Sequence, residues 1–98
     1  MRVIWKYLIP VQDRFTLEIP GAFKDVQFLC VQPQGTALNP CLWVLVDPNG
    51  PKGSWLFAVR GTGHEFTELD EPTGTYVGTF QLADGKFVGH LFHFGRMS

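Results

Sequence analysis

Charged residues are scarce in this sequence, and neither sign predominates. Only 17% of the 98 residues are charged, and 8 Lys and Arg against 9 Asp and Glu leave a formal net charge of -1. Tight binding of duplex DNA needs many cations to neutralise phosphates, so we do not expect that function. With 45% hydrophobic residues, the chain is too apolar to be intrinsically disordered. Its length fits one folded domain.

The sequence also lacks the patterns of a secretory signal and of a membrane-spanning segment. Arg2 and Lys6 interrupt the apolar start, and no small-residue cleavage site follows. The longest apolar run, residues 41–46, is far shorter than the roughly 20 residues that span a bilayer. We therefore expect a cytoplasmic protein. Because cytosolic thiols are normally reduced, Cys30 and Cys41 are expected to be buried thiols, with a disulfide between them as the alternative.

Patterns that would mark a catalytic centre are also absent. The sequence has no GxSxG motif, and its two serines are Ser54 and Ser98. His90 and His93 are three residues apart, so on a regular strand they face opposite sides and cannot share one metal ion. We expect neither a metal nor a cofactor, and we favour a protein that is not an enzyme.

Alternation of apolar and polar residues is the strongest signal that is present, whereas helical periodicity is missing. It predicts an all-β fold of about seven short, mostly antiparallel strands in a small sandwich or barrel, with little or no helix. The chain forms a single β domain over residues 1–95, with residues 96–98 as a C-terminal tail. The predicted strands are 3–9, 14–19, 26–32, 41–46, 54–60, 75–82 and 86–94.

Strand 41–46 is apolar on both faces, which predicts a central strand covered on both sides by a second sheet or a partner subunit. We therefore expect a homo-oligomer. The residues Asp47-Pro48-Asn49-Gly50 predict a turn, and Asp84-Gly85 predicts a two-residue type I′ hairpin. The connections 33–40 and 61–74 are long enough to be functional.

The start of the second long connection is the candidate ligand site. Successive backbone N–H groups of a glycine turn can bind an anion, and flanking cations strengthen the attraction. The candidate ligand-binding residues are Arg60, Gly61, Thr62, Gly63 and His64. The alternative is an ordinary glycine turn at the end of a strand.

Acidic residues gather in the same connection. They are candidates for contact with a basic partner protein, and the alternative is a solvated loop of like charges. The candidate partner-binding residues are Glu65, Glu68, Asp70 and Glu71.

Aromatic residues make up 14% of the chain. Most are expected in the core, because a small domain must bury its large rings to be stable. The alternative is that some rings stack a base or line a ligand pocket.

Several strings occur together in a fixed order, from Ile4-Trp5-Lys6-Tyr7 through 41–48 and Gly61-Thr62-Gly63-His64 to His90-Leu91-Phe92. In this order and spacing, the chain resembles a family of small phage and prophage proteins of unknown function. The resemblance implies a bacteriophage accessory gene product in the cytoplasm of a bacterial host. It implies no activity and no site residue.

The favoured interpretation is a non-catalytic phage or prophage accessory binding protein that counters host defence. It would bind a host protein, such as a CRISPR effector, or sequester a nucleotide signal. One alternative is a small enzyme that acts on a nucleotide or phosphorylated ligand through His64 and the acidic loop. Another is a structural or morphogenetic phage protein.

Overall fold

Seven β-strands make up nearly all of the regular structure. The computed structural model describes residues 1–35, 38–67 and 73–97, and within them helix is confined to two 3₁₀ segments. Each predicted strand coincides with an observed one to within two residues at either end, which confirms the all-β prediction. The elements are β1 (Val3–Leu8), β2 (Arg14–Pro20), η1 (Phe23–Asp25), β3 (Gln27–Pro33), β4 (Pro40–Val46), β5 (Lys52–Gly61), β6 (Thr75–Leu82), η3 (Ala83–Gly85) and β7 (Phe87–Arg96).

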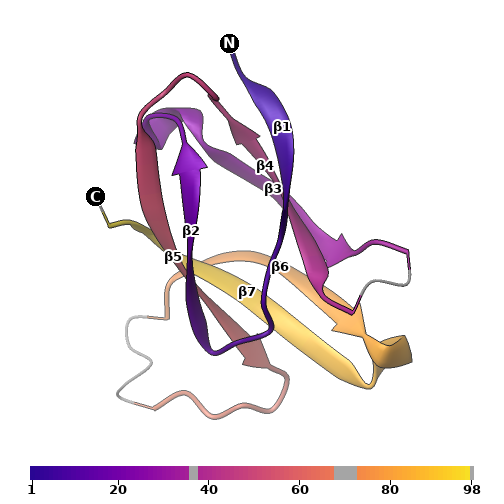
Figure 1. The fold of residues 1–98 in the computed structure, drawn as a ribbon. Coiled ribbons are helices and arrows are strands. Elements are labelled where there is room, and N and C mark those ends of the chain that lie inside the picture. The colour runs from indigo at the N-terminus through magenta and orange to yellow at the C-terminus, as the bar shows by residue number, and fades with distance from the viewer. Residues whose placement is uncertain (36–37, 68–72, 98) are drawn as a thin grey trace.

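The strands form two antiparallel sheets. Of the two predicted architectures, sandwich and barrel, the fold is therefore the sandwich. One sheet has three strands in the order β1-β4-β3, and the other has four in the order β2-β5-β7-β6. The chain passes between the sheets after β1, after β2 and after β4 (Figure 1). β4 is the central strand of the three-stranded sheet, as its apolar sequence predicts. None of the described residues forms a helix with the length and hydrophobicity required to span a bilayer.

The core lies between the inner faces of the sheets, where alternation places apolar side chains. Leu42 and Val44 of β4 are fully buried, and Phe57 of β5 stacks on Phe15 of β2 with ring centroids 5.4 Å apart. Burial of each such side chain is worth about 1.5–3 kcal/mol relative to exposure, so this layer is the main source of stability. The buried cluster consists of Ile9, Phe15, Ile19, Val31, Leu42, Val44, Val46, Trp55, Phe57, Val59, Phe80 and Leu91.

The turn predicted between β4 and β5 is confirmed. The Gly50 N–H donates to the Asp47 carbonyl at 2.9 Å, and the Asn49 N–H donates to Asp47 Oδ1 at 3.1 Å. The Asp47 side chain thus supports the same reversal as its backbone.

β7 continues to Arg96, beyond the domain boundary predicted at residue 95. The Arg96 guanidinium donates to the carbonyls of Gly21 at 3.1 Å and Lys52 at 3.2 Å. A Cβ atom on Gly53 would overlap this guanidinium, so Arg96 holds its present position only beside a glycine. The Met97 N–H also donates to the Ser54 carbonyl at 2.7 Å. Residues 96 and 97 are therefore part of the folded domain.

The β6–β7 hairpin is longer than the predicted two-residue type I′ turn. Asp84 (φ 56°, ψ 37°) and Gly85 (φ 87°) do have the left-handed dihedrals of that turn, and the Lys86 N–H donates to the Ala83 carbonyl at 3.1 Å. However, Ala83 is left-handed too, with φ 53°, so the ladder ends at the Leu82–Phe87 pair. The link therefore comprises residues 83–86.

Both cysteines are free thiols, but only Cys41 is buried, so the expected burial of Cys30 is wrong. The reason is a register shift in β3. Phe28 pairs with Val44 and Cys30 pairs with the next residue of β4, Trp43, so the two β3 side chains face opposite sides despite their even spacing. The irregularity turns Cys30 away from the core.

Candidate functional site

The guanidinium of Arg60, the first residue of the predicted anion site, is engaged inside the protein. Arg60 is only 3% exposed near the end of β5, and its Nη1 donates to the carbonyls of Asp13 at 2.9 Å and Val59 at 3.3 Å. Its guanidinium carbon also lies 5.9 Å from the centroid of the Phe66 ring, a cation–π distance. These contacts direct the cation toward the β1–β2 link and Phe66.

Gly61, Thr62, Gly63 and His64 form a turn, as predicted, and Gly63 has a left-handed φ of 87°. Two of the backbone N–H groups already have partners: Thr62 donates to the Val88 carbonyl and His64 to the Gly61 carbonyl, both at 3.0 Å. Anion binding at this turn stays a prediction, and two of the amides that it would use are occupied.

The acidic loop can be placed only at its beginning. Glu65 is exposed, whereas Glu68, Asp70 and Glu71 lie outside the described residues. Their binding of a basic partner stays a prediction. Next to Glu65, the Phe66 ring lies 6.3 Å from the ring of Phe92, so this part of the loop covers the face of the four-stranded sheet that is turned away from the core.

A polar network surrounds His90 on that same outer face. His90 Nε2 lies 2.8 Å from the Thr62 hydroxyl, His90 Nδ1 lies 2.9 Å from the Thr79 hydroxyl, and Thr79 lies 2.6 Å from the Tyr76 hydroxyl. Each imidazole nitrogen thus has a hydroxyl partner. The network depends on the pairing of Thr79 with His90 between β6 and β7, which no sequence spacing indicates.

His93 faces the other side of β7, as its spacing from His90 predicts. It pairs with Phe57 in the register, whereas His90 pairs with Arg60. Within the described residues there is no group of three or more His, Cys, Asp and Glu side chains that is placed to hold a metal ion.

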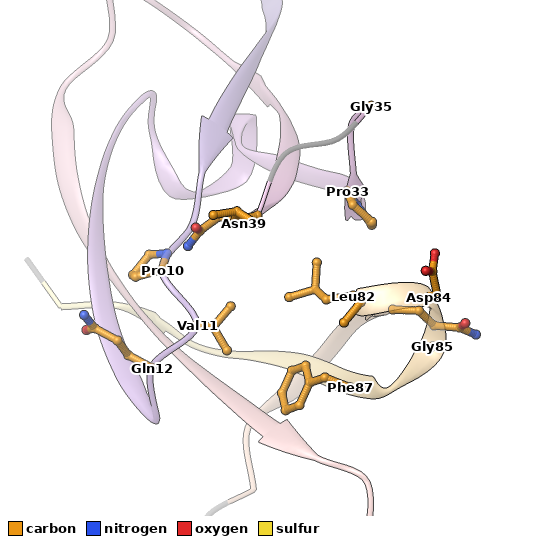
Figure 2. Close-up of a pocket in the computed structure, with 13 residues that line it drawn as sticks. Pro10, Val11, Gln12, Pro33, Gly35, Asn39, Leu82, Asp84, Gly85 and Phe87 are labelled. Atoms are coloured by element: carbon orange, nitrogen blue, oxygen red, sulfur yellow. The ribbon is translucent and has the colours of Figure 1, made fainter.

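A large hollow lies elsewhere in the described structure, and we call it the end groove. Three links meet there at one end of the sandwich: β1–β2, β3–β4 and the β6–β7 hairpin (Figure 2). Its volume is about 1030 Å³. The lining residues are Pro10, Val11, Gln12, Pro33, Gly35, Leu38, Asn39, Gln81, Leu82, Ala83, Asp84, Gly85 and Phe87.

Apolar side chains form the interior of the end groove. Figure 2 shows Val11 of the β1–β2 link pointing toward Leu82 and Phe87, the last residue of β6 and the first of β7, across the groove. The Asn39 amide donates to the Ile9 carbonyl at 3.0 Å and so connects the β3–β4 link to the β1–β2 link. Among the described lining residues, Asp84 is the one with a charge. The groove therefore suits an apolar ligand with a cation or N–H donors.

Backbone strain is concentrated in the same groove. Among the residues that the structure describes, Ala83 and Asp84 are the non-glycine residues with a positive φ, and both line it. The left-handed φ of Ala83 costs free energy, whereas an Asp such as Asp84 adopts it readily in a turn, and strained residues cluster at functional sites. The Asp84-Gly85 signal predicts a turn but not a groove, because the other walls come from links that are distant in the sequence.

Fold and groove together define a small all-β sandwich domain with a ligand-sized hollow at one end. Residues 1–96 match the model of a domain of unknown function, DUF7352, and the chain belongs to that family. No curated protein and no solved structure matches the chain. The family description gives no activity, so the function is argued from the groove itself.

Proposed function

We propose that this chain is a non-catalytic binding domain whose end groove holds a segment of a partner protein. The observation that supports this most directly is the meeting of Val11, Leu82 and Phe87 in one open hollow with Asp84 at its side. Apolar surface that is left open in a small domain typically marks a binding site. The occupant that fits is an extended apolar segment carrying Lys or Arg.

The chemistry of the lining favours a peptide over a nucleotide. No Lys, Arg or His from the described part of the chain lines the groove, whereas phosphate binding relies on cations and free amides. A volume of about 1030 Å³ is at the upper end of what small-molecule sites provide, so it accommodates several side chains. Asp84 supplies the complementary charge for a basic residue.

The phage resemblance gives this proposal a biological setting. The partner would be a host protein, such as a CRISPR effector, and the chain would act as an accessory protein against host defence. Sequestration of a nucleotide at residues 60–64 is less well supported, because the Arg60 guanidinium and two turn amides have partners within the protein. The alternative of an enzyme that acts through His64 and the acidic loop has no support from the described residues.

A displayed library of short peptides, selected on the purified protein, tests the proposal. We expect the selected peptides to be apolar with at least one Lys or Arg. Val11→Glu should weaken their binding by ~10-fold or more, a change of about 1.4 kcal/mol. Fluorescence anisotropy of labelled peptides measures it.

Leu29→Glu is the matched control, because Leu29 is 42% exposed and Val11 is 41% exposed, but Leu29 does not line the groove. It should bind the peptides as the parent does. Failure to select any peptide, or equal affinities for the two variants, would refute the groove as a peptide site.

A further inference from the structure

A second, smaller hollow lies among aromatic side chains, and we call it the aromatic pocket. Its rings come from η1, β3, β5 and β7, and it shares no lining residue with the end groove. Its volume is about 280 Å³, just below the range of roughly 300–1,000 Å³ that is typical of pockets for drug-sized ligands. It therefore suits a single ring rather than a whole nucleotide. The rings are Phe23, Phe28, Trp55 and His93.

Trp55 is the centre of this aromatic cluster. Phe28 meets its ring edge-on at 5.1 Å, and His93 does so at 5.6 Å. Phe23 stacks on Trp55 at 5.4 Å with the planes only 10° apart, yet Phe23 is 61% exposed. The pocket thus already holds one flat ring against the indole. Because Phe23 is largely exposed, its ring can move aside for a ligand at small cost.

The indole N–H of Trp55 is an unused donor. Trp55 is 2% exposed, and its Nε1 is buried with no hydrogen-bond partner among the described residues. An indole nitrogen can only donate, and an unpaired buried donor loses its hydrogen bond to water without replacement. A ligand that brings an acceptor to this nitrogen would recover that loss.

His93 supplies a second donor beside it. Its Nδ1 accepts a hydrogen bond from the Gly95 N–H at 3.1 Å, so the neutral ring carries its proton on Nε2. Burial lowers the pKa of the His93 imidazole, which keeps the ring neutral near pH 7. None of the described residues that line the pocket is Asp, Glu, Lys or Arg. The pocket therefore combines flat apolar surface and N–H donors without a charge.

We propose that the aromatic pocket binds a neutral planar heterocycle with ring carbonyl acceptors, which is the chemistry of a nucleobase. Stacking on aromatic rings is how proteins hold unpaired bases. A base stacked on Phe28, whose ring meets the indole edge-on, would direct its ring carbonyls to Trp55 Nε1 and His93 Nε2. The base could come from a free nucleoside or from single-stranded nucleic acid. Both sources present the same ring.

Two-dimensional ¹H–¹⁵N NMR of the full chain tests this, with uridine, oligothymidylate and toluene as probes. The indole signal that is missing from Trp55→Phe identifies Trp55 Nε1, and we expect uridine to shift it downfield. Toluene, which has the ring without an acceptor, should not. A shift with oligothymidylate that is much stronger than with uridine would assign the source to single strands, and comparable shifts would assign it to the nucleoside.

Trp55→Phe keeps a ring in place but removes the donor, so uridine affinity should fall ~10-fold, the effect of one lost hydrogen bond. The control is Trp43→Phe, since Trp43 lies on the outer face of β4 and does not line the pocket. The proposal is wrong if no probe moves the Trp55 indole signal, or if the two variants bind uridine equally. Val11→Glu should leave uridine binding unchanged, which separates this site from the end groove.

Discussion

The outer faces of the two sheets differ although their inner faces share one core. On the four-stranded sheet, part of the outer face is covered: Ala58 is fully buried and Arg60 is 3% exposed beneath the start of the β5–β6 loop. On the three-stranded sheet, Ile4 is 59% exposed and Leu8 is 63% exposed, and their pairing with Leu45 and Cys41 puts them on the side away from the core. The chain's own loop therefore covers part of one outer face, whereas the apolar side chains of the other are open.

This difference explains the two-sided hydrophobicity of β4. Leu42 and Val44 face the four-stranded sheet and are fully buried, whereas Trp43 and Leu45 face outward and are only partly buried. The sequence predicts a cover for both sides, and the single chain supplies one. The expected homo-oligomer stays a prediction, which native mass spectrometry of the purified protein would check.

Substitutions at adjacent residues of β4 should separate the two faces most strongly. Leu42→Ala removes a fully buried side chain from the core and should cost about 2–5 kcal/mol of unfolding free energy. Trp43→Ala should cost less than half as much in dilute solution, because Trp43 is partly exposed. Urea denaturation measures both. An equal cost would mean that the outer face of β4 is covered in solution.

Two cations on the outer faces provide the next largest contrast. Arg60→Ala removes charged hydrogen bonds to the carbonyls of Asp13 and Val59 and should cost about 1.5–3 kcal/mol. Lys6 is exposed, with its ammonium 2.6 Å from Gln34 Oε1, so Lys6→Ala should stay within about 0.5 kcal/mol. Thermal denaturation of the variants tests this, and comparable losses would show that the loop does not cover Arg60 as described.

Acid should destabilise the inner layer through His93. Burial against Phe28, Trp55 and Phe57 lowers the pKa of this imidazole in the folded chain. The unfolded chain therefore takes up the proton first, and the stability that neutral His93 provides is complete above about pH 6.5 and is lost as the pH falls toward the lowered value. His93→Gln should lose less melting temperature between pH 7 and pH 5.5 than the parent chain does. His64→Gln, on the exposed turn, is the control and should follow the parent.

What the sequence predicts well is local. Alternation in segments such as 14–19 places Phe15 and Ile19 in the core because each residue's face follows from its neighbours. The side of Cys30 is mispredicted, because the register shift after Phe28 depends on the pairing with β4. The end groove is not predicted, and the aromatic rings are given a ligand pocket only as an alternative without a location, since each hollow joins residues from several distant segments. Of the predicted ligand residues, Arg60 illustrates the limit: its type suggests an anion, but tertiary contacts engage it internally.

The smallest expected effect concerns a link rather than a face of the sandwich. Ala83 has a left-handed φ of 53°, which for an alanine costs about 1 kcal/mol, whereas glycine adopts it freely. Replacing Ala83 by glycine relieves this strain, but it also raises the entropy of the unfolded chain, which offsets about 0.4–1 kcal/mol of the gain. Ala83→Gly should therefore be neutral or stabilising by up to about 0.5 kcal/mol. Ala22, with a φ of −63°, has no strain to relieve, so Ala22→Gly should destabilise by about 0.4–1 kcal/mol. Urea denaturation measures both changes in unfolding free energy. Changes of opposite sign would show that the hairpin lining the end groove is strained at Ala83, and equal losses would show that it is not.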